Sequence, residues 1–517
     1  MTAPTTDVDA IVIGAGHNGL VAAAYLARAG LSTLLLEARS SVGGTAASET
    51  FAGATVNICN CDHLTFRTTP VFDELRLEEH GLRYVDLDPV QHNLTWSDPA
   101  SRGTAVEGYT TSHSVEETVE AIARVSPSDV DGYRRYAQAA MPAVAMVFEA
   151  AAEPPTVAGL SRLALRRRFS GLRTLLAWSR RSAADVLRSH VDHESIRGTA
   201  AVTGPMVWGI SPEFDGSGLG ALTHAMRHVG TLGRPIGGSG ALTEAIRAAY
   251  EAAGGVLRTS VRVTEIRCSG GRVSGVALDD GSFVSAPVVV SACNPHDTFL
   301  RWLTNPPPDA RRLIDRWTAV PHASGYESKL DLVLSEAPRF RDSDRSVGPT
   351  TVVAPSLASI HEGHALMQRG RVLPRPGLMI NSPTAVDPSM APDGRHVLSI
   401  EVLYTPYGLE GGWADSSEPR RWLELAAELF EPGLLESIVD WRAMTPDRYE
   451  SEFHLPAGHA TSFAGGPLAA LRNPNPELTR YETSVEGLYL TGAATFPGAG
   501  VWGASGRNCA TVVLGRH

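Results

Sequence analysis

A glycine-rich turn at positions 14–19, with the sequence GAGHNG, constrains the fold of this chain more than any other feature. It follows an apolar run at 10–13 that predicts a short strand, and it opens an alanine-rich segment at 19–29 that predicts a helix. A second apolar run at 33–36 predicts another strand. Together these segments predict a β-α-β unit with a glycine turn at the carboxyl end of its first strand.

The spacing within and after this turn is typical of a dinucleotide-binding unit. Gly14 permits a tight turn, Gly16 lets the backbone approach a pyrophosphate, and Gly19 lets the helix pack closely on the strand. Glu37 ends the second strand 18 residues after Gly19, close to the spacing of about 20 expected for a ribose-binding acid. Because a carboxylate repels a 2′-phosphate, Glu37 favours an unphosphorylated ribose, as in FAD or NAD, over NADP.

The residues after the second strand favour FAD over NAD. Ala38 and Arg39 come first, and Gly43, Gly44 and Thr45 follow. A second glycine pair lets another backbone segment reach the diphosphate, and Arg39 is expected beside the adenosine end. This extended pattern resembles the large FAD superfamily that includes amine oxidases and phytoene desaturases. Amine oxidases usually carry an arginine after the glycine pair, so Thr45 points away from that branch.

Further strand signals occur in two later parts of the chain. Apolar runs at 261–268, 273–278 and 288–292 predict strands, and another at 488–491 precedes a glycine-rich turn and a helix at about 501–514. The long stretches between them are richer in Pro, Arg, Trp and His. Three separate blocks of sequence are therefore expected to assemble one cofactor domain, and the two long insertions between them a substrate domain.

We expect an α/β fold with a Rossmann-like FAD-binding domain assembled from discontinuous segments, and a substrate-binding domain of mixed α/β type. The FAD-binding domain is expected to use residues 1–70, 236–298 and 482–517. The substrate domain is expected to use residues 71–235 and 299–481.

The C-terminal block at 487–508 reads GLYLTGAATFPGAGVWGASGRN. It resembles the closing signature of the phytoene dehydrogenase-like family. Within that family, the insert of His17 and Asn18 and the ending at 506–508 resemble the subgroup that holds bacterial carotenoid ketolases and animal phytoene dehydrogenase-like proteins. The resemblance is specific at both ends of the chain and vague through the two insertions.

This block makes physical sense as a flavin seat. Gly498 and Gly500 allow a tight turn against the isoalloxazine, and the following helix points its positive end at the N1/C2 edge, where negative charge develops on reduction. We expect the backbone of Val501 to make this contact. The resemblance implies that Val261 reaches the adenine by its backbone and that Gly492 and Ala493 lie along the pyrophosphate or ribityl chain. The expected FAD-binding residues are Gly14, Ala15, Gly16, Asn18, Gly19, Glu37, Ala38, Arg39, Gly43, Gly44, Thr45, Val261, Gly492, Ala493, Gly500 and Val501.

Charge and composition limit the partners and the compartment. The formal net charge is −11 and the pI is near 5.9, so we expect no nucleic-acid partner, since phosphate binding rests on clustered Lys and Arg. The five cysteines are scattered and form no C-x-x-C pair, which favours a reducing cytoplasm. No secretory signal and no membrane-spanning apolar run is predicted.

Two groups of possible metal ligands carry less weight than the glycine motifs. Cys59, Cys61 and His63 form a C-x-C-x-H cluster without a second ligand pair at the usual spacing. His224 and His228 lie four residues apart without an H-E-x-x-H context. We interpret both as structural thiols and histidines, and no metal site is expected.

Residues 162–181 contain seven arginines, and Leu165, Phe169, Leu172 and Leu176 follow a helical spacing among them. One interpretation is peripheral contact with an anionic membrane surface. The alternative is a lid helix whose apolar stripe packs on the core while its arginines lie in water. Gly171 weakens any single helix across this segment.

The family resemblance implies dehydrogenation of a small organic substrate of apolar or natural-product type. Hydride passes to flavin N5, a proton leaves, and oxygen or a quinone reoxidises the flavin. His459, in an Ala-Gly-His setting, matches a family position close to the flavin and is the catalytic candidate. Two alternatives stay open: a redox-neutral isomerase of a polyene-like substrate, and a non-catalytic flavin-binding assembly protein. No second glycine fingerprint follows a strand, so no nicotinamide site is expected.

Overall fold

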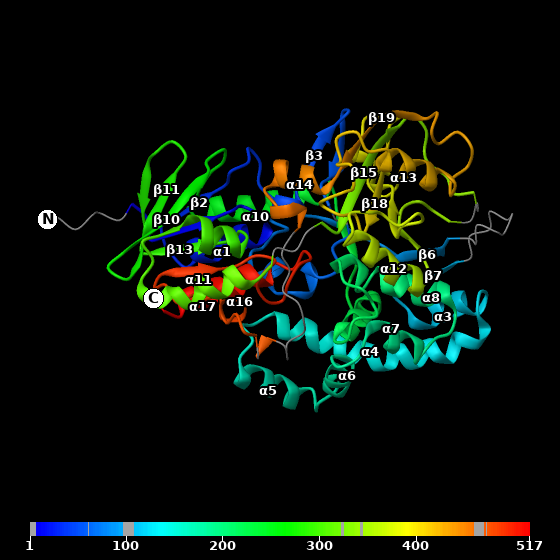
Figure 1. Cartoon of the computed structure of the whole chain (residues 1–517), viewed down its shortest axis with the longest axis horizontal. Helices are drawn as coiled ribbons and strands as arrows, with labels where there is room; N and C mark the ends of the chain where they lie inside the picture. The colour runs from blue at the N-terminus through cyan, green and yellow to red at the C-terminus, as the bar shows by residue number, and fades with distance from the viewer. Residues whose placement is uncertain are drawn as a thin grey trace.

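A five-stranded parallel sheet forms one half of the computed structural model of this chain (Figure 1). The structure describes residues 7–59, 62–96, 108–321, 325–341, 345–459, 470–471 and 473–516. In pairing order, the strands are β20 (Leu488–Leu490), β13 (Val288–Ser291), β1 (Ala10–Ile13), β2 (Thr33–Leu36) and β9 (Val256–Arg258). Three distant stretches of the chain therefore meet in one sheet, which confirms the predicted Rossmann-like fold.

The side chains of these buried strands alternate between two covered faces. On β1, Ala10 and Val12 face a layer of three helices, while Ile11 and Ile13 face a second, antiparallel sheet. The three helices are α1 (His17–Arg28), α10 (Gly240–Ala252) and α17 (Ala504–Leu514). The antiparallel sheet consists of β12 (Phe283–Ser285), β11 (Arg272–Leu278), β10 (Val263–Ser269) and β14 (Leu303–Thr304).

The elements of this part agree with the sequence predictions in most places. Strands β1 and β2 match the predicted segments 10–13 and 33–36 residue for residue, and α1 begins two residues before its predicted start. The short strand β9 was not predicted, because it lies at the sheet edge with Val256 exposed and lacks a continuous apolar run. The predicted strand at 261–268 begins instead at Val263, as β10.

The core next to the parallel sheet continues past residue 298. Phe299 and Trp317, the latter on α11 (Arg311–Ala319), are buried in the same cluster as Ile11. Trp317 Nε1 donates a hydrogen bond to the carboxylate of Glu477 at 2.6 Å. We therefore propose that the cofactor part of the chain runs to about residue 320 and resumes near Glu477.

A seven-stranded mixed sheet forms the second half of the molecule (Figure 1). In order, its strands are β19 (Ile438–Met444), β15 (Glu327–Leu334), β18 (His396–Leu403), β17 (Leu378–Asn381), β16 (Thr350–Ala354), β6 (Gln91–Thr95) and β7 (Gly108–Thr111). Trp422 of α13 (Glu418–Ala427) packs on one face with Leu330 and Ile400. Two antiparallel pairs complete the strands: the hairpin of β3 (Ser48–Phe51) and β4 (Ala54–Asn57), and the pair of β5 (Tyr84–Asp86) with β8 (Gly233–Pro235), which lies far away in the sequence.

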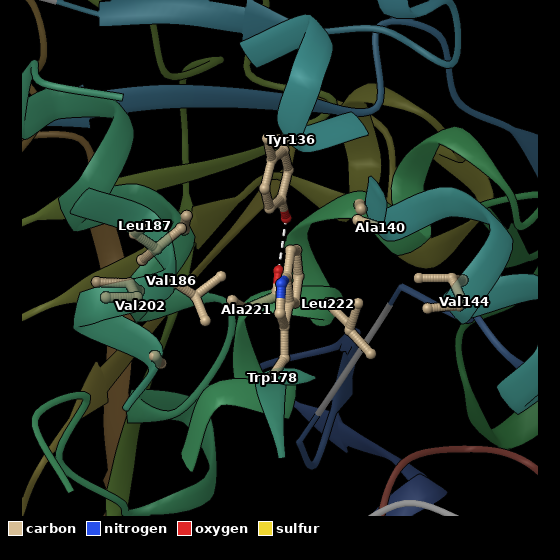
Figure 2. Close-up of a cluster of buried hydrophobic side chains, with 14 of the residues drawn as sticks. Tyr136, Ala140, Val144, Trp178, Val186, Leu187, Val202, Ala221 and Leu222 are labelled. Carbon is tan, nitrogen blue, oxygen red and sulfur yellow. Dashed lines mark hydrogen bonds between the residues drawn. The ribbon is translucent and has the colours of Figure 1, made fainter. Parts of the chain in front are cut away.

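A layer of helices lies below this sheet in Figure 1. It consists of α3 (Val115–Ala123), α4 (Val130–Ala151), α5 (Val157–Arg166), α6 (Leu172–Trp178), α7 (Ala183–Arg188), α8 (Glu194–Val202), α9 (Leu222–Ala225) and α12 (Leu357–Met367). Figure 2 shows its interior, where Tyr136 of α4 donates a hydrogen bond to the carbonyl of Ala221 at 2.5 Å beside the ring of Trp178. Within the described ranges, no helix is both long enough and apolar enough to cross a membrane.

Hydrogen bonds of the Tyr250 hydroxyl connect the edge strand β9 to β2. The hydroxyl donates to the carbonyl of Thr33 at 3.1 Å and lies 3.0 Å from the carbonyl of Val256, so it bridges β2 and β9. We expect Tyr250→Phe to lower the free energy of opening of these strands by about 1–2 kcal/mol, measured by amide hydrogen exchange.

Tyr489→Phe is the matched control for this measurement. Tyr489 is also buried, at the opposite edge of the same sheet, and its hydroxyl has no hydrogen-bond partner among the residues that the structure describes. Its removal should change the opening free energy by less than about 0.5 kcal/mol. Equal effects of the two substitutions would contradict the bridging role of Tyr250.

Candidate functional site

The carboxylate of Glu37 lies at the carboxyl edge of the parallel sheet, where β2 ends. Its Oε2 accepts a hydrogen bond from the backbone N–H of Ala15 at 2.7 Å, and its Oε1 accepts one from the N–H of Arg39 at 2.9 Å. The residue is only 9% exposed. Glu37 thereby joins the glycine turn after β1 to the segment after β2.

The two glycine segments lie side by side at this edge. Gly16 and Gly43 pair as a parallel bridge, and the N–H of Gly43 donates to the carbonyl of Ala15 at 2.8 Å. Gly43 has a φ of 111°, in the left-handed region that favours glycine. A Cβ on Gly44 would lie 3.4 Å from the Cα of Gly16. The structure therefore brings the second glycine pair against the first turn.

The glycines of the first turn have different surroundings. A Cβ on Gly19 would lie 2.0 Å from the carbonyl oxygen of Gly14, so α1 leaves no room there for a side chain. A Cβ on Gly16 would meet nothing within 4 Å, and its φ of −64° suits any residue. Gly19 is therefore required for packing, whereas Gly16 faces open space.

The C-terminal glycine segment reaches the same edge through β20. The N–H of Gly492 donates to Oγ of Ser505, in the first turn of α17, at 3.1 Å. His17 forms a hydrogen bond with the backbone of Gly500, which links the N-terminal turn to the C-terminal one. Burial nevertheless lowers the pKa of His17 to about 4, so its imidazole is neutral at pH 7.

Helix ends and unpartnered polar atoms make this edge suited to an anionic dinucleotide. Helices α1 and α17 begin after Gly16 and Gly503, which provide no side-chain cap. Uncapped helix N-termini present N–H groups and a partial positive charge to phosphate. The buried Oδ1 of Asn18 and Nη1 of Arg39 have no hydrogen-bond partner within the described part of the chain. These features, with the open space at Gly16, fit the diphosphate and sugar groups of FAD.

The remaining predicted residues lie at or beside these segments. The N–H of Val261 donates to the carbonyl of Glu37 at 2.9 Å, so a ligand contact from its backbone falls to the carbonyl oxygen. The guanidinium of Arg39 pairs with Glu49 and lies 3.9 Å above the ring of Phe453. The other predicted positions fall within the segments already described, namely Ala38, Thr45, Ala493 and Val501.

His459 follows the short 3-10 helix Pro456–Gly458. Its ring packs edge-on against Tyr326, with centroids 4.9 Å apart, and its buried Nδ1 has no partner among the described residues. Burial lowers the pKa of His459 to about 4, so the ring is neutral at pH 7. Its catalytic role stays a prediction.

A group of buried charges on the seven-stranded sheet was missed by the sequence reasoning. Glu327, Lys329 and Asp331 occupy alternate positions of β15 and therefore point to one face. Glu401 of β18 is paired directly with Lys329 across the strands. These four residues, which we call the buried charge cluster, are at most 8% exposed. Charged residues at every second position of a strand, in ESKLDLVL, were the signal available in the sequence.

The end of β4 and the residues that follow it contact the buried charge cluster. Lys329 Nζ donates to the carbonyl of Asn57 at 2.7 Å and also bonds Asp331. The thiol of Cys59 donates to Oε1 of Glu327 at 2.9 Å. The cluster therefore faces the half of the molecule that carries the glycine turns.

The same segment continues to the C-terminal glycine turn. Thr65 Oγ1 donates to the carbonyl of Val501 at 2.7 Å. Of residues 57–65, Asn57 and Cys59 therefore contact the buried charge cluster, and Thr65 contacts the expected flavin seat. Residues 60 and 61 lie outside the described ranges.

Burial shifts the pKa values of the acids in this cluster. Burial, together with repulsion from Glu327, raises the pKa of Glu401 to about 8. Burial also raises the pKa of Glu327, despite the hydrogen bond from Cys59, and it raises the pKa of the Cys59 thiol well above its usual value. At neutral pH the cluster therefore holds a proton that exposed carboxylates would release.

The histidines considered as metal ligands are bonded to protein groups. The two ring nitrogens of His63 contact the hydroxyls of Tyr84 and Ser239 at 2.8 and 3.1 Å. His224 and His228 are buried, and each contacts a tyrosine hydroxyl. Of the C-x-C-x-H cluster, Cys61 lies outside the described residues.

A parallel sheet with converging glycine turns, two uncapped helix N-termini and an acid at the end of β2 defines a dinucleotide-binding protein of the FAD type. A family model described as "Flavin containing amine oxidoreductase" matches residues 19–514, and the chain belongs to this family. It is an FAD-dependent oxidoreductase.

Relatives whose names include oxidoreductase, dehydrogenase or desaturase align along nearly the whole chain. A rat protein, "Pyridine nucleotide-disulfide oxidoreductase domain-containing protein 2" (Rattus norvegicus), is 30% identical over 98% of this chain and 93% of its own length. A limonene dehydrogenase component of Castellaniella defragrans is 28% identical over 98% of this chain and 94% of its own. "Phytoene desaturase (lycopene-forming)" of Pseudescherichia vulneris is 28% identical over 98% of both chains.

Solved structures share the fold. An oxidoreductase from Methanosarcina mazei has a TM-score of 0.64 and 17% sequence identity, covering 98% of this chain and 100% of its own. Putrescine oxidase bound to putrescine has a TM-score of 0.61 and 18% identity, covering 98% of this chain and 99% of its own.

The raised pKa of Glu401 predicts how stability depends on pH. Between its ordinary value of 4.5 and the folded value of about 8, the folded chain keeps a proton that the unfolded chain has lost. Stability should therefore fall as pH rises through this interval. Glu401→Gln replaces the protonated acid with a neutral amide, so we expect its melting temperature to fall less between pH 5 and pH 8 than that of the unmodified chain.

Tryptophan fluorescence during heating measures this difference. Glu410→Gln is the matched control, because Glu410 is exposed and its substitution should leave the pH dependence unchanged. If Glu401→Gln and the unmodified chain lose the same number of degrees between pH 5 and pH 8, Glu401 does not hold the proton.

Proposed function

We propose that this enzyme dehydrogenates an apolar organic molecule, with oxygen or a quinone as the final electron acceptor. The observation that carries the proposal is the buried charge cluster, because it lies one short segment away from the expected flavin seat. A reaction that removes a hydride and a proton from neighbouring atoms needs a proton acceptor beside the flavin. We propose that Glu327 or Glu401 is this acceptor.

Residues from both ends of the chain would hold FAD. The backbone around Gly14, Gly16 and Gly43, with the N-terminus of α1, would face the diphosphate. Glu37 would accept hydrogen bonds from a ribose hydroxyl in addition to its two backbone donors. The turn at Gly500 and the N-terminus of α17 would face the isoalloxazine.

When bound, FAD supplies a hydride acceptor at its N5 atom. The substrate loses a second hydrogen as a proton, and a double bond forms between the two atoms that lost hydrogen. A carboxylate of the pair Glu327 and Glu401 takes this proton. Two neighbouring buried carboxyls share one proton, so one of them stays ionised and can accept the proton from the substrate. His459, which is neutral at pH 7, contacts the ring of Tyr326, the residue that precedes Glu327 in the chain.

Two observations support an apolar substrate. The aligned relatives carry names that specify limonene and phytoene, both hydrocarbons. In this chain, Trp502 of the C-terminal turn packs edge-on against Phe148 of α4, with centroids 5.7 Å apart. The helix layer thus meets the expected flavin seat through aromatic side chains, which suit an apolar ligand.

Gly16→Ala and Gly19→Ala are expected to separate FAD binding from folding. Gly16 has room for a methyl group in the apoprotein, so its substitution should change stability by less than about 0.5 kcal/mol while blocking the approach of the diphosphate and lowering FAD content. Gly19→Ala should destabilise the apoprotein by about 1–3 kcal/mol, because its Cβ would overlap the carbonyl of Gly14.

The FAD-to-protein absorbance ratio after dialysis and the melting temperature of the apoprotein measure the two effects. Ala158→Gly, on the exposed face of α5, is the control for the handling of the samples. Gly30→Ala would be unsuitable, because Gly30 has a φ of 93°, in the left-handed region that favours glycine. Full FAD retention by Gly16→Ala would remove the first turn from the cofactor site.

Anaerobic reduction of the bound flavin tests the reaction itself. We expect an organic-solvent extract of lipids, delivered in detergent micelles, to bleach the flavin absorbance and to yield a product lighter by two hydrogens. NADH and NADPH should reduce the flavin slowly or not at all, since hydride transfer needs a nicotinamide held about 3–3.5 Å from N5.

Stopped-flow absorbance and mass spectrometry distinguish the alternatives. A product of unchanged mass would establish the isomerase instead of the dehydrogenase. Saturable reduction by NADH or NADPH on a catalytic timescale would overturn the assignment of the electron donor to the organic substrate.

A further inference from the structure

Four large apolar side chains are exposed on helices α5 and α6 and on the turn between them. Val157, Leu165, Phe169 and Leu176 are 68%, 64%, 56% and 43% exposed. Exposed apolar residues are ordinary when scattered, but a group of them on neighbouring helices marks an interaction surface. The two helices lie along the lower side of the molecule in Figure 1.

These side chains are exposed because the segment is not one helix. The sequence allowed a single lid helix with Leu165, Phe169, Leu172 and Leu176 packed on the core; only Leu172 packs there, so the interpretation is wrong for the other three. Helix α5 ends at Arg166, Arg168 and Phe169 adopt left-handed backbone conformations, and α6 begins at Leu172. The break turns the predicted stripe outward.

Other side chains of the same helices make the contacts with the core. Leu160 and Leu163 of α5 and Leu175 and Trp178 of α6 are buried. Figure 2 shows the ring of Trp178 beneath Tyr136, where the two rings stack with centroids 6.0 Å apart. The inner faces of α5 and α6 therefore pack on the core. The outer apolar side chains are available to bind a partner outside the chain.

Tight backbone contact fixes this arrangement. A Cβ on Gly171, between the two helices, would lie 2.3 Å from the carbonyl oxygen of Pro142 on α4. Arg166 and Arg167 both pair with Glu149 near the end of α4. The outward position of Leu165 and Phe169 is therefore set by the fold.

The charged residues of the segment that carries these apolar side chains have a single sign. Residues 154–181 contain seven arginines and neither Asp nor Glu, in a chain with a formal net charge of −11. Arg162, Arg168 and Arg173 are exposed, and none of them forms an ion pair within the ranges that the structure describes. Free arginines beside exposed apolar groups suit a partner that is both anionic and apolar.

We propose that this surface docks the enzyme on an anionic lipid bilayer. We call it the docking surface and define it by Val157, Arg162, Leu165, Arg168, Phe169, Arg173 and Leu176. Its apolar side chains enter the boundary between headgroups and acyl chains, while its arginines contact lipid phosphates. An open hollow lies between them, lined by Phe169, Leu172, Arg173, Leu176, Ala177 and Arg180.

The docking surface is connected to the cofactor half by the end of α4. Asn508 Nδ2 on α17 donates to the carbonyl of Ala151 at 3.0 Å, and Arg507 Nη1 donates to the carbonyl of Ala152 at 2.7 Å. Helix α5 starts a few residues later, at Val157. Docking would therefore bring the acyl region of a bilayer close to the helix layer. The inference stands on the surface alone and does not depend on the proposed reaction.

Cosedimentation of the FAD-loaded protein with vesicles tests the proposal. The probes are vesicles of phosphatidylcholine with phosphatidylglycerol and vesicles of phosphatidylcholine alone, at low salt. We expect strong binding to the first and weak binding to the second. Replacing Arg162, Arg168 and Arg173 with Gln should lower the partition coefficient on anionic vesicles by about tenfold or more, given the contribution of each basic residue near such a surface.

Two matched controls separate this effect from a general change in charge or apolarity. Replacing Arg369, Arg371 and Arg420 with Gln removes three exposed arginines near α12 and on α13 and should leave binding unchanged within about twofold. Replacing Leu165 and Phe169 with Ser should weaken binding, whereas replacing the exposed pair Leu300 and Phe283 with Ser should not. A melting temperature within about two degrees of that of the unmodified chain establishes that each variant is folded.

Equal pelleting of the unmodified chain and the Arg162, Arg168 and Arg173 variant on anionic vesicles would overturn the proposal. A second copy of the chain is the competing occupant of an apolar surface. Sedimentation velocity without lipid distinguishes it, because a dimer that dissociates on replacing Leu165 and Phe169 with Ser, without any vesicle binding, would assign the surface to self-association instead.

Discussion

The hydrogen bonds of the Glu37 carboxylate fix the relative positions of the segments on which the site depends. One oxygen holds the N–H of Ala15 after β1 and the other holds the N–H of Arg39 after β2. A buried carboxylate is stable only when such donors replace its water. Ala15 is followed directly by Gly16, which forms a bridge with Gly43. The hydrogen bond between Ala15 and Glu37 therefore also keeps Gly16 beside Gly43. The carboxyl edge of the sheet is therefore organised before any ligand is considered.

A line of ion pairs extends from this edge to the second sheet. Arg39 pairs with Glu49, Arg442 contacts Glu49 at 3.2 Å, and the same Arg442 contacts Asp331 at 3.2 Å. Asp331 in turn bonds Lys329 inside the buried charge cluster. Burying such charges costs several kcal/mol per ion unless each is hydrogen-bonded. The two halves of the molecule are thus joined by polar contacts that would be unfavourable if either half moved away.

The buried charge cluster contains more acids than bases, and this imbalance explains its protonation. Lys329 and the nearby Arg442 are both engaged with Asp331. The positive charge near Glu327 and Glu401 is then too small to keep both carboxyls ionised. Burial and their mutual repulsion raise their pKa values, so the pair keeps a proton. The helix layer shows the opposite arrangement. Its interior stacks Tyr136 on Trp178, and its outer side carries exposed arginines, of which Arg162, Arg168 and Arg173 form no ion pair within the described ranges.

The sequence by itself determined the features that rest on local sterics and periodicity. Strands β1 and β2 could be placed to the residue, because short apolar runs end at a glycine turn or at Glu37. The glycine turn and Glu37 predicted a dinucleotide site, and the second glycine pair at Gly43 and Gly44 then favoured FAD. Tertiary structure alone decided the rest. Glu401 meets Lys329 only because β18 pairs with β15 in one register, and the pKa of Glu401 then depends on burial that no local pattern specifies. The outward turn of Leu165 and Phe169 depends on the close contact of Gly171 with Pro142, a non-local constraint on a segment whose own spacing favours a continuous helix.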